Sequence, residues 1–256
     1  MLALPFAVSA AYAADTASTV KISGFGTGAL TFTDTDQAQF ARTNQASGAK
    51  KSPRTGVDSN LGLQASTQIN PWLSATAQGL VRKDAEEGFG AELAWAFIKA
   101  KVSDNFSVRV GRMGLPVFMI SDYRNVGYAN TMLRAPTEMY SQVPFDSIDG
   151  VDGTFQQSFG DTTVTAQLAY GKTERTLNPG TGALVNVDAK DLLALNLVAE
   201  HGPLIVRLGR ADAKARLGRS VLAGRLDPPL LFVLLDQQVS QTADDEEAAH
   251  LVNREL

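Results

Sequence analysis

The chain has 256 residues, a formal net charge of −4, no cysteine and two histidines. The missing cysteines exclude disulfides and thiolate metal sites, and two histidines are too few for a histidine metal cluster. With 23 basic against 27 acidic residues, there is no large basic field of the kind that binds nucleic acid. No Ser/His/Asp or Cys/His catalytic set can be assembled, so we predict neither an enzyme nor a cofactor site.

The N-terminus resembles the end of a secretory signal. A short apolar run, Leu2–Val8, precedes Ala11-Tyr12-Ala13, which fits the small-x-small rule for cleavage, although no basic residue comes before the run. We therefore expect residues 1–13 to be a signal-peptide remnant, with an apolar N-terminal strand or helix as the alternative. No later segment has the roughly 20 apolar residues of a transmembrane helix.

Long two-faced strands follow. From Val57 to Asn70, apolar and polar side chains alternate without interruption. A strand turns successive side chains to opposite sides, so this segment predicts a sheet with one apolar and one polar face. Similar patterns predict about nine strands, at 20–32, 57–70, 72–83, 89–102, 106–112, 147–159, 162–172, 193–200 and 204–210.

Two details of these strands bear on function and geometry. Gly24-x-Gly26-x-Gly28 superficially resembles a nucleotide loop, but it lies inside the first predicted strand, whereas a dinucleotide fingerprint needs a turn and then a helix. In 89–102, Phe89, Leu93, Trp95 and Phe97 share one face, and the phase slips at 98–102, which predicts a bulge there.

The connections alternate in length, with short turns on one rim and long loops on the other. Long loops are expected at 33–56, 113–146 and 175–187, between strands of about 10–14 residues. This arrangement is typical of outer-membrane barrels rather than of Greek-key sandwiches. After Arg210 the alternation stops, so residues 211–256 are predicted to be an aberrant or disordered tail outside the barrel.

Charged residues occur on the polar face and in the loop at 113–146. If this face encloses water, rows of guanidinium and carboxylate groups create a transverse field that screens solutes; the alternative is that they are ordinary solvated charges. Asp149-Gly-Val-Asp152-Gly153 lacks the ligand ladder of a calcium loop, so a turn or an inward-facing carboxylate pair is favoured. The candidate pore-lining residues are Arg82, Glu92, Arg109, Arg112, Arg124, Arg134, Glu138, Asp149 and Asp152.

Several stretches of the chain resemble the Gram-negative outer-membrane general porins. They are Lys21–Gly28 after the signal, Phe106–Arg112 before the long loop, and Met132–Tyr140 followed by Ser147–Gly153. The resemblance implies a homotrimer of 16-stranded antiparallel barrels in the outer-membrane lipid, open to passive diffusion of small hydrophilic solutes and ions. It also implies an inward-folded third loop, which 113–146 matches by position.

We therefore predict an all-β fold, an incomplete antiparallel transmembrane β-barrel with about nine of 16 strands in residues 14–210. Family members end in a strand with a C-terminal aromatic residue, whereas this chain ends at Leu256, which predicts a truncated or frameshifted porin and leaves open whether the shortened chain inserts and conducts. The alternative is a secreted or periplasmic β-sandwich module that binds carbohydrate. Small residues on the apolar faces, such as Ala65, Ala75 and Ala77, would fill such a sandwich core poorly.

Overall fold

The computed structural model describes residues 2–11, 20–42, 44–85, 88–118, 120–130, 135–136, 140–143, 145–178, 184–217, 220–225 and 230–237. For 2–11, and from 215 onward, only the backbone is described. No helix in these parts of the chain is long and apolar enough to cross a membrane.

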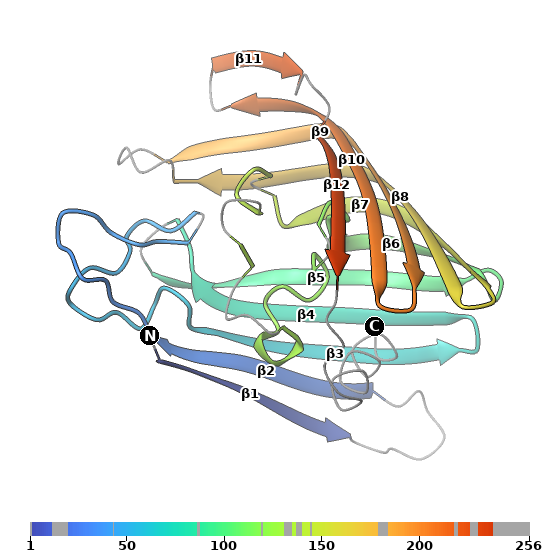
Figure 1. Cartoon of the computed structure of the whole chain (residues 1–256), viewed down its shortest axis with the longest axis horizontal. Coiled ribbons are helices and arrows are strands. Elements are labelled where there is room, and N and C mark those ends of the chain that lie inside the picture. Colours follow the sequence, from blue (N-terminus) through green and yellow to red (C-terminus); the bar gives the residue numbers. More distant parts are fainter. Residues whose placement is uncertain are drawn as a thin grey trace.

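The fold is all-β and consists of one antiparallel sheet of 12 strands (Figure 1). β1 to β11 follow one another in chain order, and β12 pairs with β10 beside β11. A short 3₁₀ turn, η1 (Gly127–Ala129), lies in the loop after β6. The strands are β1 (Leu2–Ala11), β2 (Val20–Leu30), β3 (Asn60–Asn70), β4 (Leu73–Lys83), β5 (Phe89–Lys101), β6 (Phe106–Gly114), β7 (Ser147–Phe159), β8 (Thr162–Leu177), β9 (Val185–His201), β10 (Leu204–Leu217), β11 (Ser220–Arg225) and β12 (Leu230–Gln237).

The nine strands predicted between residues 20 and 210 correspond to β2–β10, with changed ends. β3 begins at Asn60 rather than at Val57, because Val57 and Asp58 belong to a buried turn before the strand. The Asp58 carboxylate accepts a hydrogen bond of 2.8 Å from the Thr31 hydroxyl, which holds this turn against the end of β2.

The bulge predicted in β5 exists, but its predicted position was wrong. Gln78 of β4 pairs with Trp95 and Gly79 pairs with Leu93, so Ala94 is the extra residue. Side chains before and after a bulge point to opposite faces of the sheet. Leu93 is therefore exposed, whereas Trp95 and Phe97 turn to the opposite side and are buried.

Strands continue at both ends of the sheet beyond the predicted nine. β1 pairs with β2 along its whole length, while the signal-peptide interpretation of residues 1–13 stays a prediction. β10 runs past Arg210 to Leu217, and β11 and β12 pair with different halves of its outer edge. β10 continues because Ala211 and Ala213 alternate with charged neighbours; alanine is too small to make that alternation conspicuous.

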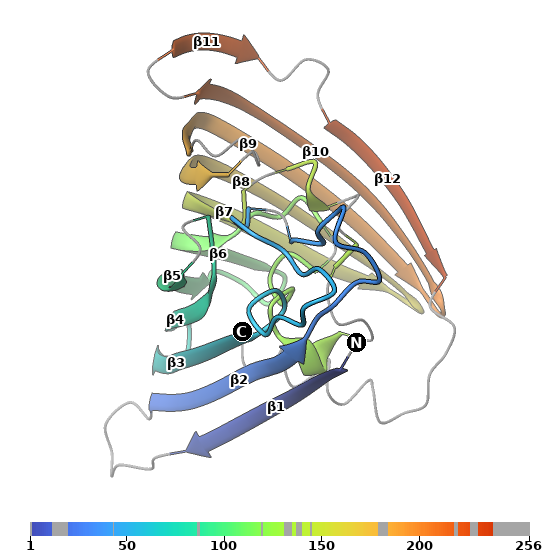
Figure 2. The same cartoon turned by 90° about the vertical axis from the view of Figure 1, so that its left-hand side faces the viewer.

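The direction of the strands follows from this order. Each strand is antiparallel to its neighbour, and both β11 and β12 pair antiparallel with β10. β1 and β12 therefore run in the same direction, and β2 runs opposite to both. No pairing joins the two edges among the described residues, so the sheet is open, and Figure 2 shows it as a curved trough.

The convex face of the trough is apolar, and the concave face carries the polar and charged side chains together with apolar patches where the loop packs. In β3, Leu61 and Leu63 are 54% and 62% exposed. The next residue, Gln64, is only 9% exposed, and its side-chain oxygen accepts a 2.9 Å hydrogen bond from Gln78 of β4. The same alternation extends across the sheet. Exposed convex side chains include Leu61, Leu63, Ile69, Val81, Leu93, Ile98, Val110, Val151, Phe155, Leu168, Leu193, Leu195, Leu197 and Leu208.

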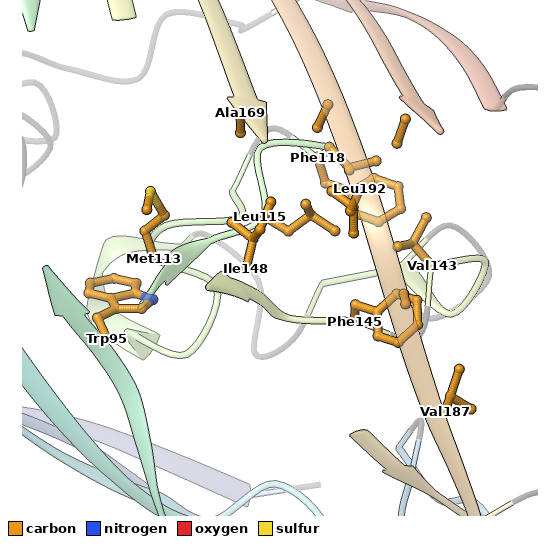
Figure 3. Close-up of a cluster of buried hydrophobic side chains, with 14 of the residues drawn as sticks. Trp95, Met113, Leu115, Phe118, Val143, Phe145, Ile148, Ala169, Val187 and Leu192 are labelled. Carbon is orange, nitrogen blue, oxygen red and sulfur yellow. The ribbon is translucent and has the colours of Figure 1, made fainter. Parts of the chain in front are cut away.

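The concave face is covered by the chain between β6 and β7. Leu115, Phe118, Val143 and Phe145 from this segment pack on side chains of β5–β10 (Figure 3). The wall side of the cluster contains Trp95, Phe97, Met113, Ile148, Ala169, Val187, Ala189, Leu192, Ala194 and Ala211. The segment is therefore fixed to the inner wall by apolar burial.

Three glycines allow close approach of neighbouring strands beneath this segment. Gly111, Gly150 and Gly171 pair side by side across β6, β7 and β8. A Cβ atom added at Gly150 would lie 2.1 Å from the backbone oxygen of Tyr170, closer than any side chain tolerates. Gly111 also has a φ of +133°, which L-residues with side chains rarely adopt.

Two substitutions in β7 test which face is packed. Ile148 is fully buried under the loop segment, whereas Val151 lies on the convex face and is 40% exposed. We expect Ile148→Ala to lower the free energy of unfolding in detergent by about 2–5 kcal/mol, because it leaves a cavity. The matched Val151→Ala should change it by less than about 1 kcal/mol. Equal losses in denaturant titrations would contradict the assignment of the two faces.

Candidate functional site

The loop between β6 and β7 comprises residues 115–146 rather than the predicted 113–146, because β6 continues to Gly114. Its described residues lie along the inside of the trough, and its two ends lie side by side. The amide of Leu115 donates a hydrogen bond of 3.1 Å to the carbonyl oxygen of Asp146, which closes the base of the loop. This backbone contact positions the Asp146 carboxylate at the mouth of the trough, where the long connections gather.

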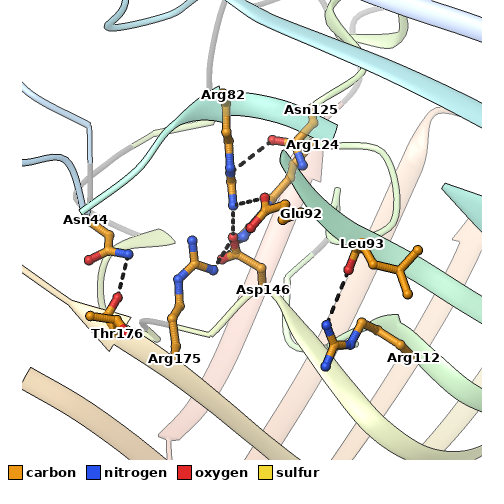
Figure 4. Close-up of polar contacts among 10 residues, drawn as sticks. All are labelled: Asn44, Arg82, Glu92, Leu93, Arg112, Arg124, Asn125, Asp146, Arg175 and Thr176. Atoms are coloured by element: carbon orange, nitrogen blue, oxygen red, sulfur yellow. Dashed lines mark hydrogen bonds and ion pairs between the residues drawn. The ribbon is translucent and has the colours of Figure 1, made fainter. Parts of the chain in front are cut away.

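Asp146 is the centre of an ion-pair cluster, here called the mouth cluster and consisting of Arg82, Glu92, Arg124, Asp146 and Arg175 (Figure 4). Arg82 comes from β4, Arg175 from β8 and Arg124 from the loop itself. The Nη2 atom of Arg82 lies 2.6 Å from Oδ2 of Asp146, and Arg124 and Arg175 also contact this carboxylate. One carboxylate thus connects the loop to two walls of the sheet.

The mouth cluster contains more positive than negative charge. Glu92 supplies the second carboxylate and lies 2.7 Å from Nη2 of Arg82, while Asn125 accepts a 3.4 Å hydrogen bond from the same guanidinium. Three guanidinium groups therefore face two carboxylates. Such an excess depends on close ion pairs, because like charges repel strongly where water is partly excluded.

Arg124 shows this dependence most clearly. Burial lowers its pKa well below the ordinary value, and the neighbouring positive charges of Arg82 and Arg175 lower it further. Its contact with Asp146 is the interaction that compensates for this environment. The charge of the loop arginine is therefore costly in its buried position unless the carboxylate is present.

A cavity of about 110 Å³ adjoins the mouth cluster. Its wall is predominantly polar and comes from β4–β8 and the loop, so it suits water or a small polar solute better than an apolar ligand. The lining includes Arg82, Glu92, Arg112, Ser121, Arg124, Asn125, Asp146, Thr173, Glu174 and Arg175.

A second cluster lies deeper on the concave face. Arg109 of β6 pairs with Asp152 of β7 through two nitrogens, with Nη2 2.5 Å and Nε 3.1 Å from the carboxylate. Asp152 is fully buried and also accepts a 2.8 Å hydrogen bond from Gln167. The guanidinium carbon lies 5.2 Å from the centre of the Phe97 ring, and Asp122 of the loop lies 3.6 Å from Nη1. This pair is fixed on every side.

Arg112 and Asp149 form a third ion pair, 2.7 Å apart, in a different position on the sheet. They are three residues from Arg109 and Asp152 along paired strands with no register shift, so alternation assigns them to the convex side. The long Arg112 side chain nevertheless reaches the Leu93 carbonyl and the edge of the cavity. The pair is about 40% exposed and lies off the face that carries the other predicted residues.

The same geometry corrects the reading of Asp149-Gly-Val-Asp152-Gly153. The two carboxylates point to opposite faces, so they form neither an inward-facing pair nor a shared cation site. Across the described residues, no group of three potential metal ligands gathers.

The structure thus brings together five of the predicted residues, in two groups: Arg82, Glu92 and Arg124, and separately Arg109 and Asp152. Arg134 and Glu138 lie outside the described residues. Arg175 was missed because the predicted strand stopped at Lys172 and left Arg175 in the loop at 175–187, whereas β8 continues to Leu177 and its alternation turns Arg175 inward. Asp122 was missed because no periodicity marks a loop residue.

Comparison with known proteins finds neither a protein-family model nor a curated protein that matches the chain. The resemblance to porins therefore stays an expectation drawn from the sequence stretches quoted above, and function is inferred from the sheet and its charged clusters.

Removal of the central carboxylate tests the mouth cluster. In Asp146→Asn, three guanidinium groups would share one remaining carboxylate, so we expect a loss of about 3 kcal/mol in unfolding free energy. The loop should also become cleavable in limited proteolysis of the folded protein. Asp104→Asn is the matched control, since Asp104 pairs with Lys101 in an exposed turn. A loop that stays protected in Asp146→Asn would refute the anchoring role.

Proposed function

We propose that the chain forms the wall of an outer-membrane porin, a water-filled channel for passive diffusion of small hydrophilic solutes and ions. The observation that carries this proposal is the distribution of side chains on the two faces: the convex face is apolar and exposed, whereas the concave face carries the enclosed polar and charged side chains and is apolar only where the loop packs on it. A soluble protein buries its apolar surface, whereas a membrane barrel turns it toward lipid and keeps its interior polar.

Aromatic side chains at both ends of the strands support a membrane position. Trp72, Phe106 and Phe159 lie near the short turns, and Phe89 and Tyr170 lie toward the long loops; all five are exposed. Membrane barrels have such girdles at both interfaces, about 25 Å apart. A strand such as β4, with 11 residues, is about 36 Å long and spans about 25 Å when tilted by about 45°.

The loop on the concave face supports a diffusion channel with a constriction. It is held by apolar packing and by Asp146, and it carries Asp122 and Arg124 toward charged residues of the wall. Fixed opposite charges across a narrow aqueous path would select solutes by size and charge. In a bilayer both sheet edges must be paired, so the proposal requires closure within the chain or with further copies.

The competing carbohydrate-binding sandwich would need a second sheet on the apolar face. No second sheet occurs in the described part of the chain, and that face includes small residues such as Ala77 and Gly79. Fractionation separates the two functions. Recovery from outer membranes only with detergent would support the porin, and a soluble periplasmic monomer would refute it.

Conductance across planar bilayers tests the channel directly. We expect the purified full chain to produce stable ohmic current steps, because a closed polar trough would conduct through a fixed aqueous path. A membrane-inserted protein that gives no steps would refute the proposed function even if fractionation supports the location.

A pair of arginine substitutions in β3 tests which face meets lipid. Leu63 points to the convex side and Gln68 to the concave side, and both are exposed. We expect Leu63→Arg to cost about 2–4 kcal/mol of folding free energy in lipid vesicles, as charges on the lipid face do. Gln68→Arg should cost much less, because its charge stays in water. The reverse order would show that the concave face meets lipid.

A further inference from the structure

We infer that the channel favours anions, with small inorganic and carboxylate anions as its preferred solutes. This inference rests on the proposed function and adds the solute class. It depends on three cations of the concave wall, Lys99, Arg109 and Arg207, that converge on a single carboxylate of the loop, Asp122.

Two of the three cations are cross-strand neighbours, Lys99 and Arg109, and the third, Arg207, lies on a distant strand. Lys99 lies on β5, Arg109 on β6 and Arg207 on β10, yet each interacts electrostatically with Asp122. Asp122 therefore lies within electrostatic range of cations from both walls of the trough, 3.6 Å from the nearest of them. We call Lys99, Arg109, Arg207, Asp122 and Asp152 the inner cluster.

Both carboxylates of the inner cluster already interact with groups of the protein. Asp152 is fully buried, bound by Arg109 at two positions and by Gln167 at a third. Asp122 contacts Arg109 at 3.6 Å. The inner cluster thus contains three cations and two carboxylates, and both carboxylates form their ion pairs with Arg109.

Lys99 and Arg207 are consequently without a direct partner. Within the described residues, neither side chain makes an ion pair or a hydrogen bond, and Arg207 is only 6% exposed with an unpaired Nε atom. A buried charge without a partner is costly, so a negatively charged solute near it is stabilised and a cation is repelled.

The groups around Arg207 do not cancel its charge. Tyr123 and Tyr140 lie close to it, and burial raises the pKa of both, so each stays neutral and keeps its hydroxyl proton. On the same face, Lys21 of β2 and Glu200 of β9 have opposite charges, so together they add no net charge to the wall. The mouth cluster also has one surplus positive charge. The proposed channel therefore carries a net positive charge both at the mouth cluster and at the inner cluster.

The test is the reversal potential of the full-length protein in planar bilayers under a KCl gradient. We expect chloride to permeate about three times more readily than potassium, the scale that one or two surplus charges produce near a solvated path. A reversal potential of the sign that indicates potassium preference overturns the inference while leaving the porin function intact. Absence of any conductance overturns both.

Substitutions assign the preference to the inner cluster. Lys99→Glu should bring the chloride-to-potassium ratio to about one or below, because the local charge falls by two units. The matched control is Lys101→Glu in the same strand, since Lys101 is exposed and pairs with Asp104 at 2.9 Å in the turn. Arg207→Gln keeps size and polarity and should lower the ratio with unchanged step frequency. Equal effects of Lys99→Glu and Lys101→Glu would overturn the inference.

Discussion

The strict alternation of side chains along a pleated strand is the constraint on which this molecule depends. Every inward residue forces its neighbours outward, so a polar side chain on one face is followed by a side chain on the other, as Gln64, 9% exposed, and Leu63, 62% exposed, illustrate. A one-residue insertion reverses this relation, and β5 uses one at Ala94. Trp95 and Phe97 thereby lie on the concave face and form part of the apolar surface on which the loop packs.

Alternation also explains how much could be predicted from the sequence. The all-β class and the strands β2–β10 follow from a period of two, which is visible wherever large apolar residues mark one face. Register shifts are not visible in that pattern, because a bulge depends on the pairing with a neighbouring strand. The inward position of Trp95 could therefore not be assigned from the sequence, whereas that of Arg175 was missed because the end of β8 was predicted too early.

The charged clusters were predictable in kind but not in grouping. Arg82, Arg109 and Asp152 alternate correctly with apolar residues, so their face could be assigned. Asp122 and Asp146 lie in a loop without periodicity, and their positions depend on how that loop packs on the wall. The distinction between Asp149 and Asp152 depends on counting along one strand, which converts an apparent carboxylate pair into two residues on opposite sides of the sheet.

The directions of the edge strands have a consequence for assembly. β1 covers the outer edge of β2, and β12 runs parallel to β1. With β1 in position, joining the two edges would require a parallel pair in an otherwise antiparallel sheet. If residues 1–13 are removed on export, the edge of β2 is uncovered, and it runs opposite to β12. Processing of the N-terminus and completion of the cylinder would then be linked, with the leader serving as a temporary cover for the strand that forms the final seam.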